Sequence, residues 1–169
     1  MDTLPNQVFD RQAVCHHKHR AAAELPSFDF LLREAAGRLV DRLLDIRRDF
    51  PLALELTTHG HVLRDAIRQA RHKETEDSRP SIKVLLHAQM APAMLRGAGP
   101  LQLVADEESL PIENSCLDLI VSSCGLHWAN DLPGVLIQSR RALKPDGLLL
   151  VNFFGGNTLT ELRRSLLQA

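Results

Sequence analysis

Hydrophobic positions along the chain alternate between two spacings. Short runs rich in Leu, Ile and Val are apolar at successive positions, which is typical of strands buried between two helical layers. Longer segments carry apolar residues three and four positions apart, which predicts amphipathic helices. Strands are predicted from Leu52 and over residues 82–88, 101–105, 117–121 and 148–154, and helices over residues 28–46, 62–72 and 130–143. This alternation indicates an α/β fold with a parallel sheet.

The pattern is clearest over residues 116–154. A strand is followed by a helix that Asn130 or Asp131 can cap, with Pro133 in its first turn. Residues 144–147, Lys-Pro-Asp-Gly, predict a tight turn before the next strand. The segment is therefore a βαβ unit, and parallel sheets built from such units bind ligands at the carboxyl ends of their strands.

Composition and charge narrow the function classes. The 169 residues leave room for one domain with a sizeable core, and the formal net charge is -1. Balanced charge and few aromatic residues argue against a nucleic-acid binder, and no apolar run approaches the length of a membrane span. The N-terminal residues lack the apolar core of a signal peptide. We therefore expect a soluble, cytoplasmic protein.

The cysteines and histidines near the N-terminus raise the question of a metal site. Cys15, Cys116 and Cys124 lack CxxC spacing, so we expect free thiols. Cys15 begins the run Cys-His-His-Lys-His-Arg, but neighbouring helix positions point about 100° apart, so few of these side chains could meet one ion. We expect a basic helix over residues 11–23 and no metal.

Several ordered motifs together resemble one enzyme family. Residues 118–123, 126–133 and 143–147 resemble the second half of the core of class I S-adenosylmethionine-dependent methyltransferases. Four further segments are similar to the branch that holds the malonyl-carrier-protein O-methyltransferase of biotin synthesis and the arginine hydroxylase of complex I assembly. These segments are residues 8–11, 50–56, 105–111 and 155–163.

The resemblance implies a Rossmann-like, three-layer α/β/α fold with a mostly parallel five-stranded sheet. It divides the chain into an N-terminal helical segment, residues 1–49, and a methyltransferase core, residues 50–169, that lacks the last two strands of the usual core. In such enzymes the N-terminal helices lie over the active site. The strand over residues 148–154 would then have an unpaired apolar edge, so we expect marginal solubility or a homodimer through this edge.

The resemblance also implies an S-adenosylmethionine site that begins after the first strand. Glu55 stands where the family has an acid. In the family, three glycines of this loop let backbone N–H groups approach the ligand closely. In this chain their positions fall on Thr57, His59 and His61, and Gly60 is out of register. A bulky residue at a positive φ costs about 1–2 kcal/mol, so we expect weakened cofactor binding.

The ends of the following strands carry the other implied cofactor contacts. Gln89 replaces the acid that accepts from the ribose hydroxyls, and Met90 provides an apolar wall, or else only packs in the core. Asp106 matches the acceptor for the adenine amino group, with Glu107 beside it. The alternative for this acidic pair is a solvated loop. Ser122 lies at the same predicted edge.

Two residues after the fourth strand are candidates for chemistry. His127 is the titratable side chain that the resemblance places at the pocket mouth, as a proton acceptor or an orienting group. The alternative is a packed histidine that caps the following helix. Trp128, the only Trp, is expected to form a wall of the substrate pocket.

Three functions remain open at this point. The first is methyl transfer to a small-molecule or carrier-protein-bound carboxylate, which needs no strong base because positioning supplies most of the acceleration. The second is an assembly factor that hydroxylates a protein arginine. The third is an inactive remnant that acts only by binding. A nicotinamide dehydrogenase is disfavoured because no GxGxxG follows the first strand.

Overall fold

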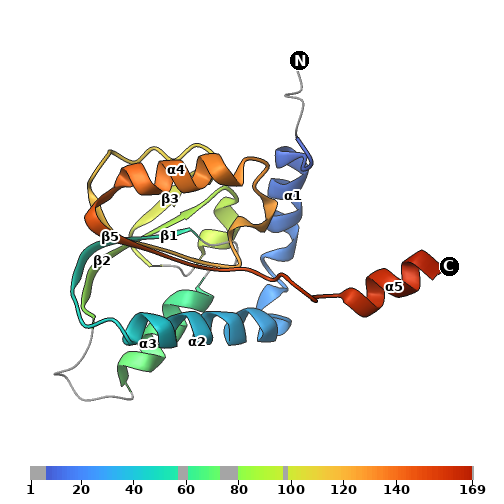
Figure 1. The fold of residues 1–169 in the computed structure, drawn as a ribbon, viewed down its shortest axis with the longest axis horizontal. Helices are drawn as coiled ribbons and strands as arrows, with labels where there is room; N and C mark the ends of the chain where they lie inside the picture. Colours follow the sequence, from blue (N-terminus) through green and yellow to red (C-terminus); the bar gives the residue numbers. More distant parts are fainter. Residues whose placement is uncertain (1–6, 57–60, 73–79, 97–98, 169) are drawn as a thin grey trace.

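A parallel five-stranded sheet organises the molecule (Figure 1). The structure, a computed structural model, describes residues 7–56, 61–72, 80–96 and 99–168. The strand order is β3-β2-β1-β4-β5, and every neighbouring pair is parallel. The strands are β1 (Phe50–Leu56), β2 (Ile82–Gln89), β3 (Gln102–Val104), β4 (Leu117–Ser123) and β5 (Leu143–Asn152).

Helices flank the sheet in separate layers. Figure 1 shows α2 and α3 below the sheet, α4 above it, α1 across one end, and α5 standing away from the body. These helices are α1 (Arg11–Ala21), α2 (Phe30–Leu44), α3 (Val62–His72), α4 (Leu132–Ala142) and α5 (Thr160–Gln168). Three 3-10 turns lie in the connections: η1 (Leu25–Ser27) between α1 and α2, η2 (Pro92–Leu95) between β2 and β3, and η3 (Leu126–Trp128) between β4 and α4. The predicted Rossmann-like α/β/α class with five parallel strands is therefore confirmed.

Side chains of successive residues in the central strands point to opposite faces of the sheet. In β4, Leu119 and Val121 pack with α2 and α3, whereas Ile120 packs with Val135 of α4. All four side chains are fully buried. A strand between two helical layers must be apolar on both faces, which explains the continuous apolar runs of the sequence. None of the helices in the described part of the chain has the length and apolarity that crossing a bilayer would demand.

The predicted turn at residues 144–147 lies inside a strand. β5 begins at Leu143 and pairs with Leu117, but its next partner contact joins Leu148 to Leu119. The intervening residues form a bulge in which Asp146 has a φ of 65°. The strand therefore keeps its direction through Lys-Pro-Asp-Gly, because the bulge accommodates the extra residues.

Asp118 ties three strands together at the amino end of the sheet. Its carboxylate accepts from the Leu52 N–H of β1 at 2.8 Å and from the Lys144 Nζ of β5 at 2.9 Å. Burial by itself raises the pKa of Asp118, but the hydrogen bonds from Lys144 and Leu52 outweigh it and hold this pKa below the usual value.

Replacing Asp118 with Asn should therefore reduce the loss of unfolding free energy at acidic pH, which is the acid limb of the stability curve. A carboxylate whose pKa is lower in the folded state stabilises fully above its unfolded pKa, and this contribution is lost as the pH falls through the folded pKa. Urea midpoints measured from about pH 7 to about pH 3 should fall less in Asp118→Asn than in the native protein. Glu113→Gln, at an exposed carboxylate for which the described residues show no ion pair, is the control and should leave the acid limb unchanged. Parallel acid limbs in Asp118→Asn and the native protein would contradict this role.

Candidate functional site

The N-terminal helix α1 lies over the carboxyl ends of the strands. Asp10 caps the helix by accepting from the N–H groups of Gln12 and Ala13. Just before it, the Phe9 N–H donates to Asn130 Oδ1 at 2.8 Å and the Asn130 amide returns a bond to the Phe9 carbonyl at 3.1 Å. The start of α1 is thus fixed to the loop that precedes α4.

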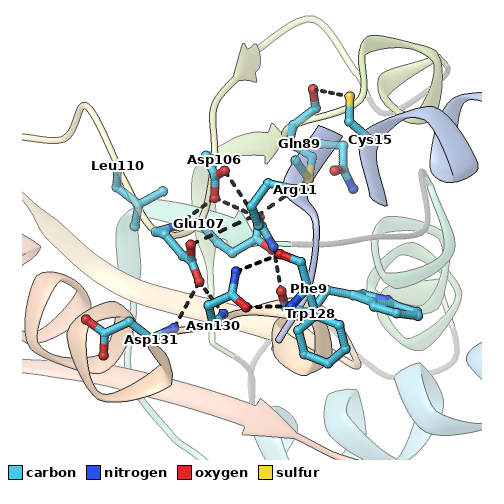
Figure 2. A network of polar contacts seen from close by, with 12 residues as sticks. Phe9, Arg11, Cys15, Gln89, Asp106, Glu107, Leu110, Trp128, Asn130 and Asp131 are labelled. Atoms are coloured by element: carbon cyan, nitrogen blue, oxygen red, sulfur yellow. Dashed lines mark hydrogen bonds and ion pairs between the residues drawn. The ribbon is translucent and has the colours of Figure 1, made fainter. Parts of the chain in front are cut away.

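Arg11 joins this helix to the acidic loop after β3 (Figure 2). Its Nε and Nη2 donate to the two Asp106 oxygens at 3.2 and 2.6 Å, and Nη2 lies 2.8 Å from Glu107 Oε1. Nη1 donates to the Trp128 carbonyl at 2.6 Å. Burial lowers the pKa of Arg11, but the bonds to Asp106 and Glu107 more than reverse this effect, so the pKa is raised and the guanidinium stays charged.

Gln89 and Met90 face the same helix. Lys18 Nζ donates to Gln89 Oε1 at 3.5 Å, and the same oxygen accepts from the Ala91 N–H at 3.3 Å. The Met90 sulfur lies 3.6 Å from Arg11 Nη2, and the Met90 carbonyl accepts from Cys15 Sγ at 3.6 Å. The residues implied as ribose and adenine contacts are therefore gathered at one edge, and side chains of α1 already bind them.

Glu55 lies at the same end of the sheet but contacts a neighbouring strand. It is fully buried, and its Oε2 is 2.6 Å from Nδ1 of His87, which is 2% exposed. The two residues are register partners in the β1–β2 ladder, so their side chains share one face of the sheet. Of the three predicted glycine positions, Thr57 and His59 lie outside the described residues, as does Gly60. The third, His61, directly precedes α3, and its Nε2 lies 3.6 Å from Asp65 Oδ2.

Ser122 holds the end of β4 against the end of β1. Its side chain is fully buried, and Oγ donates to the Leu56 carbonyl at 2.5 Å. A Cβ at Gly125 would collide with this carbonyl and with the Ser122 hydroxyl. Glycine is therefore required at position 125 by the close approach of two strand ends.

His127 is held by the backbone on both sides of its ring. Nδ1 lies 3.1 Å from the Cys124 carbonyl and Nε2 accepts from the Phe154 N–H at 2.9 Å. With these partners Nε2 is the acceptor and Nδ1 is placed to donate to the Cys124 carbonyl. The neighbouring Trp128 is 44% exposed and meets Phe9 edge to face, with ring centroids 5.3 Å apart. His127 thus orients the loop, and Trp128 stands at the surface beside α1.

The space between the strand ends is small. A cavity of about 10 Å³ lies there, lined by Leu56, Ala88, Ala105, Glu107, Gly125 and Leu126. Ligand pockets usually enclose about 300–1,000 Å³. The chemistry fits a nucleoside, because Asp106, Glu107 and Gln89 offer acceptors for amino and hydroxyl groups. The cavity itself is too small for one, and Arg11 and Lys18 occupy these acceptors.

The fold and this edge define a Rossmann-like α/β protein with its ligand groups at the carboxyl ends of parallel strands. Residues 64–151 match the methyltransferase domain family, and the chain belongs to that family. The mitochondrial arginine-hydroxylase NDUFAF5 of Homo sapiens is 41% identical over 166 residues, which cover 94% of this chain and 45% of that protein. The malonyl-[acyl-carrier protein] O-methyltransferase of Halorhodospira halophila is 31% identical over 167 residues, 93% of this chain and 53% of that protein. The chain therefore spans about half the length of these relatives.

Solved structures support the same fold. An S-adenosylmethionine-dependent methyltransferase of Thermotoga maritima superposes with a TM-score of 0.59 at 17% identity, covering 89% of this chain and 79% of that one. A chain in the complex of the Haloferax volcanii Trm112 methyltransferase activator with a methyltransferase gives a TM-score of 0.68 at 18% identity, covering 90% of this chain and 66% of that one. At these identities the likeness concerns the fold.

Three side chains at this edge are not assigned a role by the sequence. Its pattern places Arg11 and Lys18 in a basic helix and gives no signal at His87. Arg11 could have been found, because the Phe-Asp-Arg segment at residues 9–11 was already part of the family resemblance. The contacts of Lys18 and His87 depend on helix placement and strand register, which no local pattern encodes.

The Glu55–His87 pair gives a direct test of buried electrostatics. Changing His87 to Leu leaves a fully buried carboxylate without its partner, and removing one member of a buried pair costs about 3–5 kcal/mol of unfolding free energy. The double variant Glu55→Leu/His87→Leu should recover most of that loss, since it buries no charge. Urea denaturation measures both effects.

An exposed ion pair provides the control for that experiment. Arg38 and Glu34 lie 2.8 Å apart on α2 with side chains 78% and 63% exposed. Arg38→Ala should cost no more than about 0.5 kcal/mol, as is usual for surface pairs. If His87→Leu costs as little as Arg38→Ala, the pair contributes nothing to the fold.

Proposed function

We propose that the protein is an S-adenosylmethionine-dependent methyltransferase whose acceptor is a carboxylate, either of a small molecule or of a carrier-bound group. Family membership and the acceptors gathered at one sheet edge support the cofactor. The state of His127 supports the acceptor class, because both of its ring nitrogens are bound by backbone groups. A carboxylate is already anionic near neutral pH and needs no base to remove a proton.

In this proposal the residues after β2 and β3 hold the nucleoside. Asp106, assisted by Glu107, accepts from the adenine amino group, and Gln89 accepts from a ribose hydroxyl beside the apolar wall of Met90. The bound cofactor supplies an electrophilic methyl group. Arg11 and Lys18 first give up Asp106 and Gln89, so cofactor binding requires these two side chains to move while α1 keeps its place. Glu55 and Ser122 support this edge from below, through His87 and Leu56.

The acceptor lies beside Trp128 and His127 in the proposal. His127 acts as an orienting group rather than a free base, because its Nε2 fixes the Phe154 backbone. Trp128 forms a wall that excludes water from one side of the acceptor. Positioning of the carboxylate next to the donor then provides most of the rate acceleration.

A second function has specific support. The relatives named arginine-hydroxylase NDUFAF5 from Mus musculus and Homo sapiens are 40% and 41% identical over 94% of this chain. We therefore keep hydroxylation of a protein arginine as the alternative. Mass spectrometry of products separates the two functions, since methyl transfer adds the mass of a CH₂ unit and hydroxylation adds that of one oxygen atom.

Cofactor binding is tested by calorimetry and thermal unfolding with S-adenosylmethionine. A ligand at about 100 times its Kd stabilises the native state by about 2.7 kcal/mol, which raises the Tm of a domain of this size measurably. Asp106→Asn should bind at least about tenfold more weakly, because one charge-assisted acceptor is lost. Glu113→Gln, an exposed acid away from this edge, is the control and should bind like the native protein. Absence of both heat and a Tm shift in the native protein would leave only a binding remnant.

We also propose a homodimer through the β5 side of the sheet. β5 is the last strand in the sheet order, and a groove of about 820 Å³ lies between it and α2, with Leu150, Phe153 and Phe154 among its lining residues. Phe153 is 45% exposed. Unpaired strand edges beside apolar surface favour association.

Sedimentation at rising protein concentration tests this dimer. The native protein should associate, and Phe153→Glu should shift it toward monomer because a charge would enter the interface. Leu167→Glu, on the 78% exposed end of α5, should not. A native protein that stays monomeric across the series rules the interface out.

A further inference from the structure

A second cavity lies beneath α1, beside the cofactor edge. It has a volume of about 200 Å³. Its walls come from α1, η1, η2 and η3, and its lining residues are Val14, His17, Lys18, Ala21, Leu25, Met94 and Trp128. Most of this surface is hydrocarbon or aromatic. Because Trp128 is 44% exposed, the cavity reaches the surface at that residue.

Lys18 is the unusual member of this lining. The residue is only 8% exposed, and no ion pair found among the described residues includes it. Its hydrogen bond to Gln89 is long, at 3.5 Å, and the partner is a neutral amide. Burial lowers the pKa of Lys18, with Arg11 opposing its charge and Glu107 favouring it. A buried ammonium without an adjacent carboxylate is costly, and a bound anion would relieve that cost.

We propose that this cavity binds the carboxylate of a short monocarboxylic acid, or the acidic end of a longer acyl group, with Lys18 as its counter-ion and the apolar wall around its chain. This assignment rests on the proposed function, because it names the group that holds the acceptor. The volume is smaller than that of most ligand pockets, which suits a short chain. A neutral amide or ester of the same shape leaves Lys18 without a counter-ion and binds more weakly.

Trp128 provides a direct readout. It is the only Trp in the chain and lines the cavity, so its fluorescence reports on occupancy. The native protein is titrated with sodium hexanoate, hexanamide and methyl hexanoate at about pH 7 and constant ionic strength. Hexanoate should give a saturable change, and the two neutral analogues should bind at least about tenfold more weakly, as expected for loss of a charge-assisted contact.

Two variants separate Lys18 from general charge effects. Lys18→Met keeps most of the side-chain length and should weaken hexanoate binding by at least about tenfold, to the level of hexanamide. Lys83→Met removes an exposed lysine from β2 and should bind hexanoate like the native protein. Circular dichroism of each variant confirms that it is folded. If Lys18→Met does not fold, the comparison of hexanoate with hexanamide on the native protein decides alone.

The outcome is independent of the methyl donor. The titration contains no S-adenosylmethionine, so a failure of cofactor binding leaves this test intact. Equal affinity for hexanoate and hexanamide, or native affinity in Lys18→Met, would overturn the site. Carboxylate binding without any cofactor binding would instead keep the site and remove the methyltransferase function.

Discussion

The ion pairs between Arg11 and the carboxylates after β3 control access to the acceptor groups at the carboxyl ends of the strands. They are short, at 2.6 and 2.8 Å to Asp106 and Glu107, and the guanidinium is only 15% exposed. Because Glu107 is itself buried, Arg11 cannot leave without exposing that carboxylate to a new partner or to water. Access to Asp106 therefore depends on this side chain, which also helps to hold α1 over the strand ends.

The same edge shows two ways of burying charge. Glu55 and His87 lie 2.6 Å apart across adjacent strands, in a contact fixed by ladder register. Lys18 is buried against a neutral amide and an apolar wall, with carboxylates only at longer range. The first arrangement is self-contained and contributes to the fold. The second lacks an adjacent counter-ion, which is typical of charged groups in ligand sites.

The fold was predictable because its signals are local. Strands between two helical layers are apolar at most positions, so the runs in β1, β2, β4 and β5 stand out. Asp131 and Pro133 mark the start of α4 by their own chemistry. The turn predicted at residues 144–147 lies inside β5 rather than before it. Pro, Asp and Gly specify a local backbone conformation, and a bulge within a strand uses that conformation as well as a reversal does.

The site was less predictable, because its contacts join distant parts of the chain. Motif positions brought Gln89, Met90 and Asp106 to one edge, as expected from parallel strands. The sequence could not show that Arg11, 95 positions before Asp106, would bind the Asp106 carboxylate. Nor could it show that the Ser122 hydroxyl would donate to the Leu56 carbonyl. The role of a side chain depends on which partners the fold places next to it. Residue types and spacing indicate only which partners are chemically suitable.

Lys18 connects the two proposed ligand sites. Its ammonium lines the cavity under α1 and also donates to Gln89, the proposed ribose acceptor. A carboxylate that draws Nζ further into the cavity would lengthen its contact with Gln89 beyond 3.5 Å, so acceptor binding would release the amide oxygen for the nucleoside. By linkage, a nucleoside at Gln89 would free Lys18 for the carboxylate by the same free energy. One lysine thus couples the two ligands without any movement of the sheet, and the long 3.5 Å bond to Gln89 makes that exchange inexpensive.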